Sequence, residues 1–520
     1  MSAGVVVVGA GQNGLAAALR LARAGRRVTV LERRAAVGGL CAAFEFHAGY
    51  VAPGILHDDG LVAPAVAARL GLAAHGLALE ESPPVCIAEE GGPGLVLSRR
   101  PDGAGELAAR SPRDAAAFAE LGAFLERARP LVERLTTMPP PALSPRTLGE
   151  RWEVVRHALA VWKLGRRDTL ELLRVAPMCV ADFLNERFES PLLVEALAAP
   201  AVAATWAGPW SAGTTTHLIF ASARSGRRVA GGPPALVAAL ERAARAAGAE
   251  IRTGAEVTCI RVVRGRVARV ELADGEALDA EAVVATCDPK RAFLELLAPG
   301  TLPLRIEDEF RRIRSRGTAA KVLLALRSPL ELVARRGQRF ETIRVGGGHV
   351  DELERAFDAV KYRRFAERPY LDVRVPTVRD PGLAPPGGDV VSILASYAPI
   401  DLDGGWTAER RAELLEAVLR RLESVAPAVR TQLVASLVLT PADLEREYAL
   451  TGGQLHHGEP ALDLLLVMRP APSAARYATA VPGLYLGGSG SHGGGGVNPA
   501  AGLLAAEALL ACRNFSHPPP

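Results

Sequence analysis

Hydrophobic residues at the start of the chain form two short runs, separated by a glycine-rich turn and an Ala/Leu-rich stretch. Residues 5–8 are all valine, residues 9–14 form the turn, and residues 15–21 are helix formers. The second apolar run, residues 28–31, ends on Glu32. Short β-branched runs bounded by turn residues predict buried strands, and the stretch between them predicts a helix. The pattern therefore predicts a βαβ unit.

Apolar runs further along the chain predict further strands and helices. The predicted strands are residues 95–97, 250–252, 256–260, 266–272, 282–286, 319–326, 370–375, 389–397 and 483–487. Helical patterns cover residues 147–206, 235–247, 408–426 and 498–510. The β-rich block at residues 225–290 is expected to return to the first unit, with other elements inserted around it.

The glycine-rich turn has the spacing that binds a dinucleotide. Gly9 permits a tight turn, Gly11 lets a pyrophosphate approach the backbone, and Gly14 lets the helix lie close on the strands. The N-terminus of the helix offers free N–H groups to the phosphates. Glu32 stands where a carboxylate accepts the hydroxyls of a ribose. Because strand, glycines, helix, second strand and acid all agree, we predict an adenine dinucleotide at this unit.

The residues after the acid indicate which dinucleotide binds. Arg33 follows directly, and the pair Gly38–Gly39 lies downstream. This arrangement resembles the extended fingerprint of FAD-binding oxidoreductases, whereas NAD dehydrogenases do not need the glycine pair. We therefore predict FAD as the cofactor. The chemistry of flavin disulfide reductases is excluded, since it needs a CxxxxC pair and Phe46 stands five residues after Cys41. Cys41 is instead expected to be a small buried residue.

The glycine loop at residues 488–496 leads from a predicted strand into the last predicted helix. Too few residues follow it for a second βαβ unit, so we expect the loop to bring N–H groups to the flavin side of the same FAD. The predicted fold is α/β: a discontinuous Rossmann-type FAD-binding domain with an inserted mixed α+β substrate domain. The FAD-binding domain is predicted at residues 1–70, 225–300 and 478–520, and the substrate-binding domain, with a helical cap, at residues 71–224 and 301–477.

The residues expected to contact FAD come from the fingerprint, the glycine pair, one strand of the β-rich block and the last loop. In FAD folds that strand presents its backbone to the adenine, and Val257 is expected there. The full set is Gly9, Ala10, Gly11, Gln12, Asn13, Gly14, Glu32, Arg33, Gly38, Gly39, Leu40, Val257, Gly488, Ser489, Gly496 and Val497.

Composition narrows the function classes. Apolar residues make up 49% of the chain and the net charge is only +4, which is typical of a globular domain. Basic residues are scattered among acids and no basic tract is interleaved with aromatics, so nucleic acid is not an expected partner. Cysteine spacing predicts no metal site. The first strand begins too early for a leader peptide, and no apolar run is long enough to span a bilayer, so a cytoplasmic protein is expected.

One predicted helix carries an apolar stripe among basic residues. Trp152, Val155, Leu159 and Trp162 fall on one face. Basic residues surround the stripe, namely Arg151, Arg156, Lys163, Arg166 and Arg167. Such a helix either contacts a membrane surface peripherally or packs as a cap on its own domain. We expect the packed arrangement, with peripheral membrane contact as the alternative.

Taken together, the motifs resemble the phytoene-desaturase-like FAD oxidoreductases, which include carotenoid desaturases, carotenoid isomerases and retinol saturase and are related to amine oxidases. Within this superfamily the chain resembles the branch called pyridine nucleotide-disulfide oxidoreductase domain protein 2-like. Besides the fingerprint and the last loop, the resemblance rests on residues 285–291, 367–370, 450–453, 457–459 and 468–470. It implies an amine-oxidase/phytoene-desaturase-like fold over nearly the whole chain, but no particular substrate.

The resemblance implies redox chemistry in which flavin N5 accepts a hydride and the protein handles a proton. Candidates for the proton are His57, His457 and His217, in that order; His57 is expected to face the flavin, where an imidazole moves a proton near neutral pH. The favoured reaction is desaturation of a hydrophobic small molecule such as a polyene. The alternatives are an amine or alcohol oxidase, and a reduced-flavin isomerase, a saturase or an inactive flavin-binding protein. The oligomeric state is left open.

Overall fold

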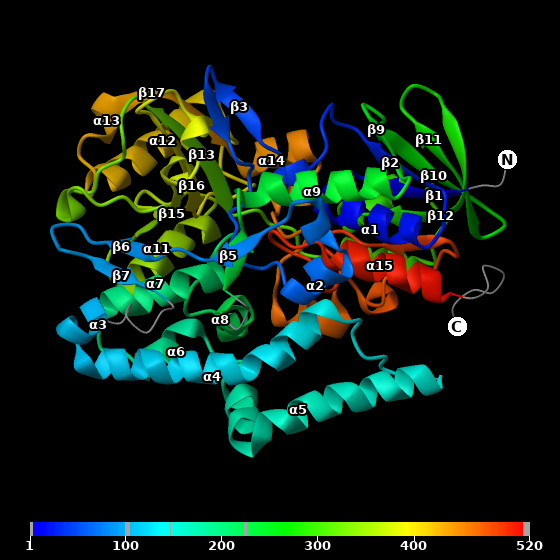
Figure 1. The fold of residues 1–520 in the computed structure, drawn as a ribbon, viewed down its shortest axis with the longest axis horizontal. Helices are drawn as coiled ribbons and strands as arrows, with labels where there is room; N and C mark the ends of the chain where they lie inside the picture. The colour runs from blue at the N-terminus through cyan, green and yellow to red at the C-terminus, as the bar shows by residue number, and fades with distance from the viewer. Residues whose placement is uncertain (1–3, 99–104, 146, 223–225, 513–520) are drawn as a thin grey trace.

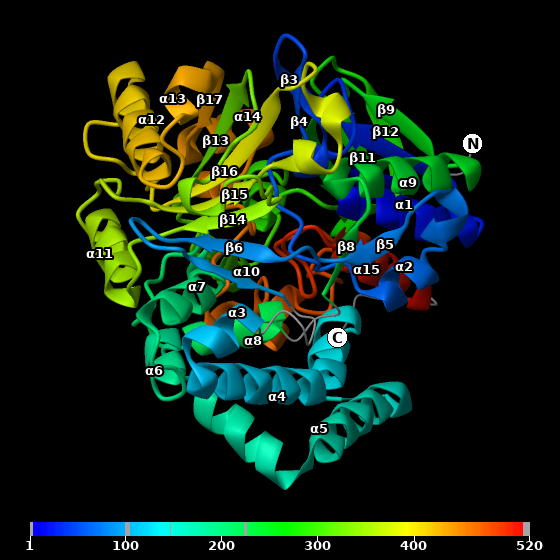
Figure 2. The same ribbon diagram turned by 60° about the vertical axis from the view of Figure 1, so that its left-hand side comes forward.

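Two seven-stranded sheets organise the molecule, which we describe from a computed structural model covering residues 4–98, 105–145, 147–222 and 226–512 (Figures 1 and 2). The first has the order β10-β11-β12-β1-β2-β9, with β18 beside β12. Its strands are β1 (Gly4–Val8), β2 (Val28–Glu32), β9 (Glu250–Thr253), β10 (Val257–Val263), β11 (Arg266–Leu272), β12 (Ala277–Ala285) and β18 (Leu484–Leu486). The predicted βαβ unit is confirmed, and its strands pair in parallel.

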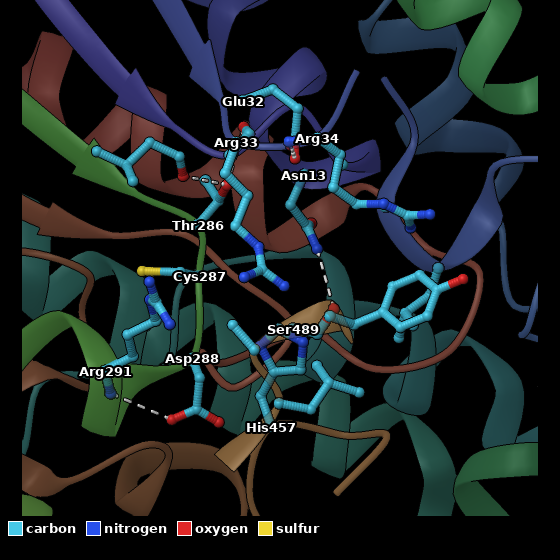
Figure 3. Close-up of a pocket in the computed structure, with 18 of the residues that line it drawn as sticks. Asn13, Glu32, Arg33, Arg34, Thr286, Cys287, Asp288, Arg291, His457 and Ser489 are labelled. Carbon is cyan, nitrogen blue, oxygen red and sulfur yellow. Dashed lines mark hydrogen bonds between the residues drawn. The ribbon is translucent and has the colours of Figure 1, made fainter. Parts of the chain in front are cut away.

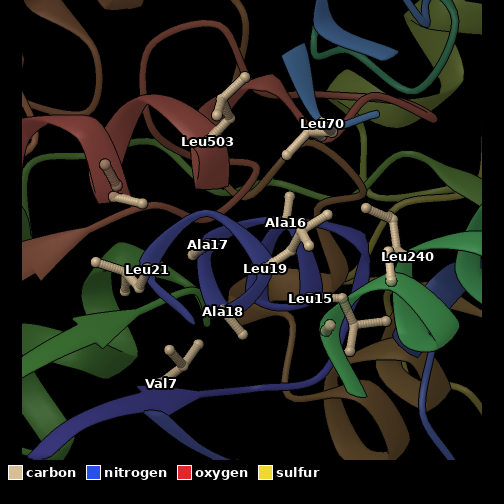
Figure 4. Close-up of a cluster of buried hydrophobic side chains, with 14 of the residues drawn as sticks. Val7, Leu15, Ala16, Ala17, Ala18, Leu19, Leu21, Leu70, Leu240 and Leu503 are labelled. Carbon is tan, nitrogen blue, oxygen red and sulfur yellow. The ribbon is translucent and has the colours of Figure 1, made fainter. Parts of the chain in front are cut away.

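The parallel core of this sheet is covered on both faces. Helices α1 (Gln12–Arg23), α9 (Gly232–Ala246) and α15 (Ala500–Ala511) pack on one face (Figure 4). Val5 and Val7 point toward these helices, while Val6 and Val8 join the core on the other face. A strand buried on both faces needs apolar residues at every position, which explains the unbroken valine run.

The second sheet has the order β17-β13-β16-β15-β14-β6-β7. Its strands are β6 (Val85–Ala88), β7 (Leu95–Leu97), β13 (Ala319–Leu326), β14 (Thr342–Val345), β15 (Tyr370–Arg374), β16 (Asp389–Ser396) and β17 (Leu433–Leu439). Two-stranded ribbons are formed by β3 (Phe44–His47) with β4 (Tyr50–Ala52), and by β5 (Leu79–Glu81) with β8 (Arg227–Val229). The strands of the first sheet fall inside the ranges that we assigned to the FAD-binding domain, and the division into domains stays a prediction.

The two faces of the second sheet differ in polarity. Leu371 and Val373 of β15 join an apolar core with α12 (Ala408–Glu423). The alternate residues Tyr370, Asp372 and Arg374 therefore point to the opposite face, since side chains alternate along a strand. We call this second face, which carries Tyr370, Asp372 and Arg374, the polar floor.

The predicted helical region at residues 147–206 consists of three helices, and one of them is bent. These three are α5 (Leu148–Val175), which is the bent one, α6 (Val180–Asn185) and α7 (Pro191–Val202). The remaining α-helices are α2 (Pro64–Arg69), α3 (Gly105–Arg110), α4 (Pro112–Thr137), α8 (Thr214–Ser222), α10 (Leu304–Arg311), α11 (Val350–Lys361), α13 (Val429–Gln432) and α14 (Pro441–Tyr448). Gly165 interrupts α5 with φ 82° and ψ 163°. A residue with a side chain is strained at such a positive φ, so glycine permits the bend.

The packing expected for the apolar stripe of α5 is wrong. Trp152 is 53% exposed and Trp162 is 76% exposed, and Val155 and Leu159 are exposed as well. Helix α4 is the neighbouring helix in both views, but it does not cover the stripe. Amphipathic spacing fixes the angular positions of these residues but not the direction in which the stripe points. The inward side of α5 instead makes polar contacts, such as Asp168 with Arg127 and Glu153 with Arg476, and packs Val175 into an apolar cluster.

Candidate active site

A groove of about 150 Å³ opens at the carboxyl ends of the parallel strands (Figure 3). In open α/β sheets this edge is where ligands bind. Val8 and Leu31 end their strands at the groove, and the N-terminus of α1 faces it. Of the residues expected at FAD, those that line the groove are Gly9, Gly11, Gln12, Asn13, Glu32, Arg33, Gly38, Gly39, Leu40, Val257 and Ser489.

The three fingerprint glycines differ in what surrounds them. Gly9 has φ 98°, which a residue with a side chain rarely adopts. A Cβ on Gly14 would lie 1.8 Å from the carbonyl oxygen of Gly9, so Gly14 permits helix and strand to touch. A Cβ on Gly11 would meet nothing within 4 Å, because it would project into the groove. This open cradle is the space that a pyrophosphate needs.

Glu32 is held in place by backbone donors. The backbone N–H of Ala10 donates to Oε2 of Glu32 at 2.8 Å, and that of Arg34 donates to Oε1 at 2.9 Å. A carboxylate oxygen accepts more than one hydrogen bond, so Glu32 keeps capacity for ribose hydroxyls while its orientation is fixed. Ala10 itself is fully buried and contributes this N–H from behind the groove.

The remaining residues expected at FAD lie behind or beside the groove. Val497 is fully buried, and a Cβ on Gly488 would lie 2.5 Å from the carbonyl oxygen of Thr286. Gly496 lines a second cavity, and its carbonyl oxygen accepts a hydrogen bond from Nε2 of Gln12 at 2.6 Å. The last loop therefore meets the fingerprint helix where the two cavities adjoin.

Asn13 ties the groove to the last helix. Its Nδ2 donates to Oγ of Ser489 at 3.2 Å, and its Oδ1 accepts from the backbone N–H of Gly502 at 3.1 Å. Gly502 lies in the first turn of α15, where backbone N–H groups lack partners within the helix.

We expect Asn13→Ala to lower the free energy of unfolding by about 1–3 kcal/mol, because it leaves a buried N–H without an acceptor. Urea unfolding with saturating FAD measures this loss. Ser489→Ala is the matched control, since it removes only the partner on the groove side and should cost less. Equal losses in the two variants would contradict the capping role.

The second cavity is a chamber of about 420 Å³ that shares Leu56 with the groove. Its apolar walls include Ile55, Leu197, Leu218, Phe220 and Leu394. The polar floor of the second sheet closes its other side with Thr342, Arg344, Tyr370, Asp372 and Arg374. The chamber is thus apolar on its walls and charged on its floor.

His57 lies at the edge of this floor and contacts a buried lysine. Nζ of Lys321 is 2.8 Å from Nε2 of His57, and Nδ1 of His57 is 3.3 Å from Oδ2 of Asp372. Lys321 and Asp372 both pair with Leu394 across the sheet, which places them in one row. Arg374 completes the cluster, with Nη2 donating to Asp372 at 3.2 Å and to Asp59 at 2.6 Å.

Burial and neighbouring charges shift the pKa values of the side chains in this cluster. Burial, and then the neighbouring Lys321 ammonium, lower the pKa of His57 to about 3. Burial also lowers the pKa of Lys321 to about 7. Although burial acts to raise it, the pKa of Asp372 is held below its usual range by the Arg374 guanidinium. The expectation that His57 itself titrates near neutral pH is therefore wrong. Two other members of the cluster titrate near there: Lys321, and Asp59, whose pKa is raised by burial to about 6.

The other two candidate histidines lie in different places. His217 lines the chamber, and its Nδ1 is 3.0 Å from the carbonyl oxygen of Ala201. His457 lines the FAD groove, and burial lowers its pKa to about 4. The structure thus brings His57 and His217 to the chamber and leaves His457 beside the groove.

Lys321, Asp372 and Arg374 were missed from the sequence. One signal was available: Lys321 is the single charged residue within the apolar run 319–326. Asp372 and Arg374 alternate with apolar residues in a predicted strand, which marked one polar face without indicating what it meets.

Comparison with known proteins identifies the family. The model of the family "Flavin containing amine oxidoreductase" matches residues 14–510. The mouse (Mus musculus) protein "Pyridine nucleotide-disulfide oxidoreductase domain-containing protein 2" is 31% identical, over 97% of this chain and 93% of its own length. "Hydroxyneurosporene desaturase" of Rubrivivax gelatinosus is 28% identical, over 98% and 93%.

A solved structure has the same fold. An oxidoreductase from Methanosarcina mazei superposes with a TM-score of 0.59 at 18% identity, covering 98% of this chain and 99% of its own. The predicted fold class, family and cofactor are confirmed. The chain belongs to the flavin-containing amine oxidoreductases, and it is an FAD-dependent oxidoreductase.

Proposed function

We propose that the protein is a dehydrogenase that introduces a carbon–carbon double bond into a largely hydrophobic small molecule, such as a polyene or another natural product. The observation that carries the proposal is the chamber beside the FAD groove, with His57 in its lining and the buried Lys321 in contact with His57. Desaturation removes a hydride from one carbon and a proton from its neighbour. FAD is the acceptor that we assign to the hydride, and the His57–Lys321 pair is our candidate for the proton.

Side chains of the protein accept the proton that leaves the substrate. Bound FAD supplies the hydride acceptor. Because burial lowers the pKa of Lys321 to about 7, its neutral amine is available near neutral pH, and this amine accepts a proton. His57 lies between this amine and Asp372, so the carboxylate orients the ring and stabilises the added charge. Proton release to the His57–Lys321 pair therefore accompanies hydride loss.

The chamber also constrains the substrate. Its walls suit hydrocarbon, because they are lined by Leu197, Leu218 and Phe220. The floor carries buried polar atoms with no hydrogen-bond partner among the described residues, including Oη of Tyr370 and Oδ1 of Asp372. Buried polar groups are normally satisfied. We infer a substrate that is mostly apolar and carries a polar group at one end.

Anaerobic mixing of the oxidised flavoprotein with candidate substrates tests the proposal. The flavin absorption should bleach, and the product should have lost two hydrogens with its carbon skeleton intact. Release of an amine or an aldehyde would instead indicate the oxidase alternative. Bleaching by NADPH or NADH without substrate would favour a saturase or a reductively primed isomerase, and would overturn the dehydrogenase proposal.

A further inference from the structure

Helix α5 presents a surface whose charge is of one sign. Its exposed charged side chains are all basic: Arg151, Arg156, Lys163, Arg166, Arg167 and Arg174, of which Arg174 is paired with Glu171 and Glu186. The acids of the helix are partly or wholly buried and most are paired within the protein. Asp168 accepts from Arg127 at 2.5 and 3.1 Å, and Glu153 accepts from Arg476 at 2.9 Å. The outer face is therefore cationic because the anionic side chains are turned inward.

Large apolar side chains share this outer face with the cations. Leu148 is 83% exposed, and the stripe from Trp152 to Trp162 continues it at spacings of three and four. Beyond the bend, Leu170 and Leu173 are exposed as well. A run of exposed large apolar residues on one helix marks an interaction surface, whereas scattered ones are ordinary.

The bend of α5 at Gly165 places exposed apolar and basic residues together at its most protruding point. Gly165 divides α5 into two arms, and Figure 2 shows a V whose apex points away from the rest of the molecule. Trp162, Lys163, Arg166 and Arg167 flank this glycine and are all exposed. The most protruding part of the helix therefore carries a tryptophan and three cations.

We propose that α5 docks the protein on the surface of a bilayer that contains anionic lipids. Tryptophan prefers the interface between lipid and water, and Arg and Lys extend their charged ends to the headgroups while their stems lie in apolar surroundings. A second copy of the chain fits less well, because a two-fold interface would set this cationic face against itself. Nucleic acid would leave the apolar stripe unmatched.

Docking in this orientation places the chamber close to the membrane. The inner side of α4 contributes Leu135 and Thr136 to the chamber wall, while the helix packs against α5. Helices α5 and α4 therefore lie between the bilayer surface and this wall of the proposed substrate site. No helix in the described ranges is both long and apolar enough to cross a bilayer.

Co-sedimentation of the purified flavoprotein with vesicles tests the docking. Wild type should sediment with phosphatidylcholine vesicles that contain phosphatidylglycerol, and less with phosphatidylcholine alone. Arg166→Gln/Arg167→Gln should weaken the binding roughly thirtyfold, since each cation near an anionic surface contributes a factor of about five. Trp152→Ser/Trp162→Ser should weaken it at least about tenfold, through lost apolar burial.

Matched changes elsewhere on the surface serve as controls. Arg305→Gln/Arg312→Gln removes an exposed arginine of α10 and the exposed arginine directly after it, and Tyr362→Ser removes an exposed aromatic at the end of α11. These variants should bind vesicles as wild type does, and all variants should keep the flavin spectrum.

Two results would overturn the docking proposal. One is wild type that stays in the supernatant with anionic vesicles. The other is a wild-type dimer in light scattering that Trp152→Ser/Trp162→Ser converts to a monomer, which would make the face an interface between copies. Neither result depends on substrate turnover, so docking can fail while the proposed function stands.

Discussion

Replacing Lys321 with methionine should slow reduction of the flavin by substrate by a factor of about 10²–10⁴, the range that a positioned proton acceptor contributes. Methionine has nearly the same length and suits the buried position, since Lys321 is only 1% exposed. The variant should therefore fold and bind FAD while losing the amine that contacts His57. Single-turnover flavin bleaching under anaerobic conditions measures the effect.

The pH dependence separates this role from a structural one. Burial lowers the pKa of Lys321 to about 7, and the neutral amine is the active form. The wild-type rate should therefore rise as pH increases through about 7 and then level off. In Lys321→Met this step should vanish. His57 cannot produce the step, because its pKa is lowered to about 3 and its ring is already neutral.

Lys361→Met provides the control for removal of a lysine, since this residue lies on the surface of α11 and pairs with Asp358 and Glu354. It should leave both the rate and the pH profile unchanged. A Lys321→Met enzyme that retains the rise near pH 7 would show that another group takes the proton.

The sequence was most informative where the chain folds locally. The unit from Val5 to Glu32 could be predicted because its strand, turn and helix signals lie within a short segment and agree with one another. The last glycine loop could be placed for the same reason. Both predictions depend on backbone geometry, which glycines and β-branched residues specify directly.

The proton-handling cluster could not be predicted, because its members are far apart in the chain. His57 and Lys321 are separated by 264 positions, and only the pairing of β13, β16 and β15 brings Lys321 and Asp372 into one row. The pKa values follow from that burial, so they could not be assigned earlier. The direction of the α5 stripe was equally hidden, because it depends on polar contacts such as Arg127 with Asp168.

Replacing Gly11 with valine should remove FAD without disturbing the fold. Gly11 has φ −70° and ψ 177°, an extended conformation that a β-branched residue adopts readily. Its added Cβ would meet no protein atom within 4 Å, and the side chain would fill the groove instead. Forcing atoms into space that a ligand occupies costs at least about 1–3 kcal/mol, so FAD affinity should fall tenfold to a hundredfold or more.

Gly14→Ala is the comparison variant, because it should destabilise the fold, whereas Gly11→Val should affect FAD binding alone. The new Cβ would lie 1.8 Å from the carbonyl oxygen of Gly9, so α1 could no longer rest on β1 and stability itself should fall. Flavin absorbance after purification reports binding in each variant, and thermal unfolding with and without added FAD reports the fold. Added FAD stabilises any folded protein that binds it. Gly11→Val should keep the unfolding temperature of the flavin-free protein and show a much smaller rise with FAD than wild type. A full complement of flavin in this variant after purification would show that the pyrophosphate binds elsewhere.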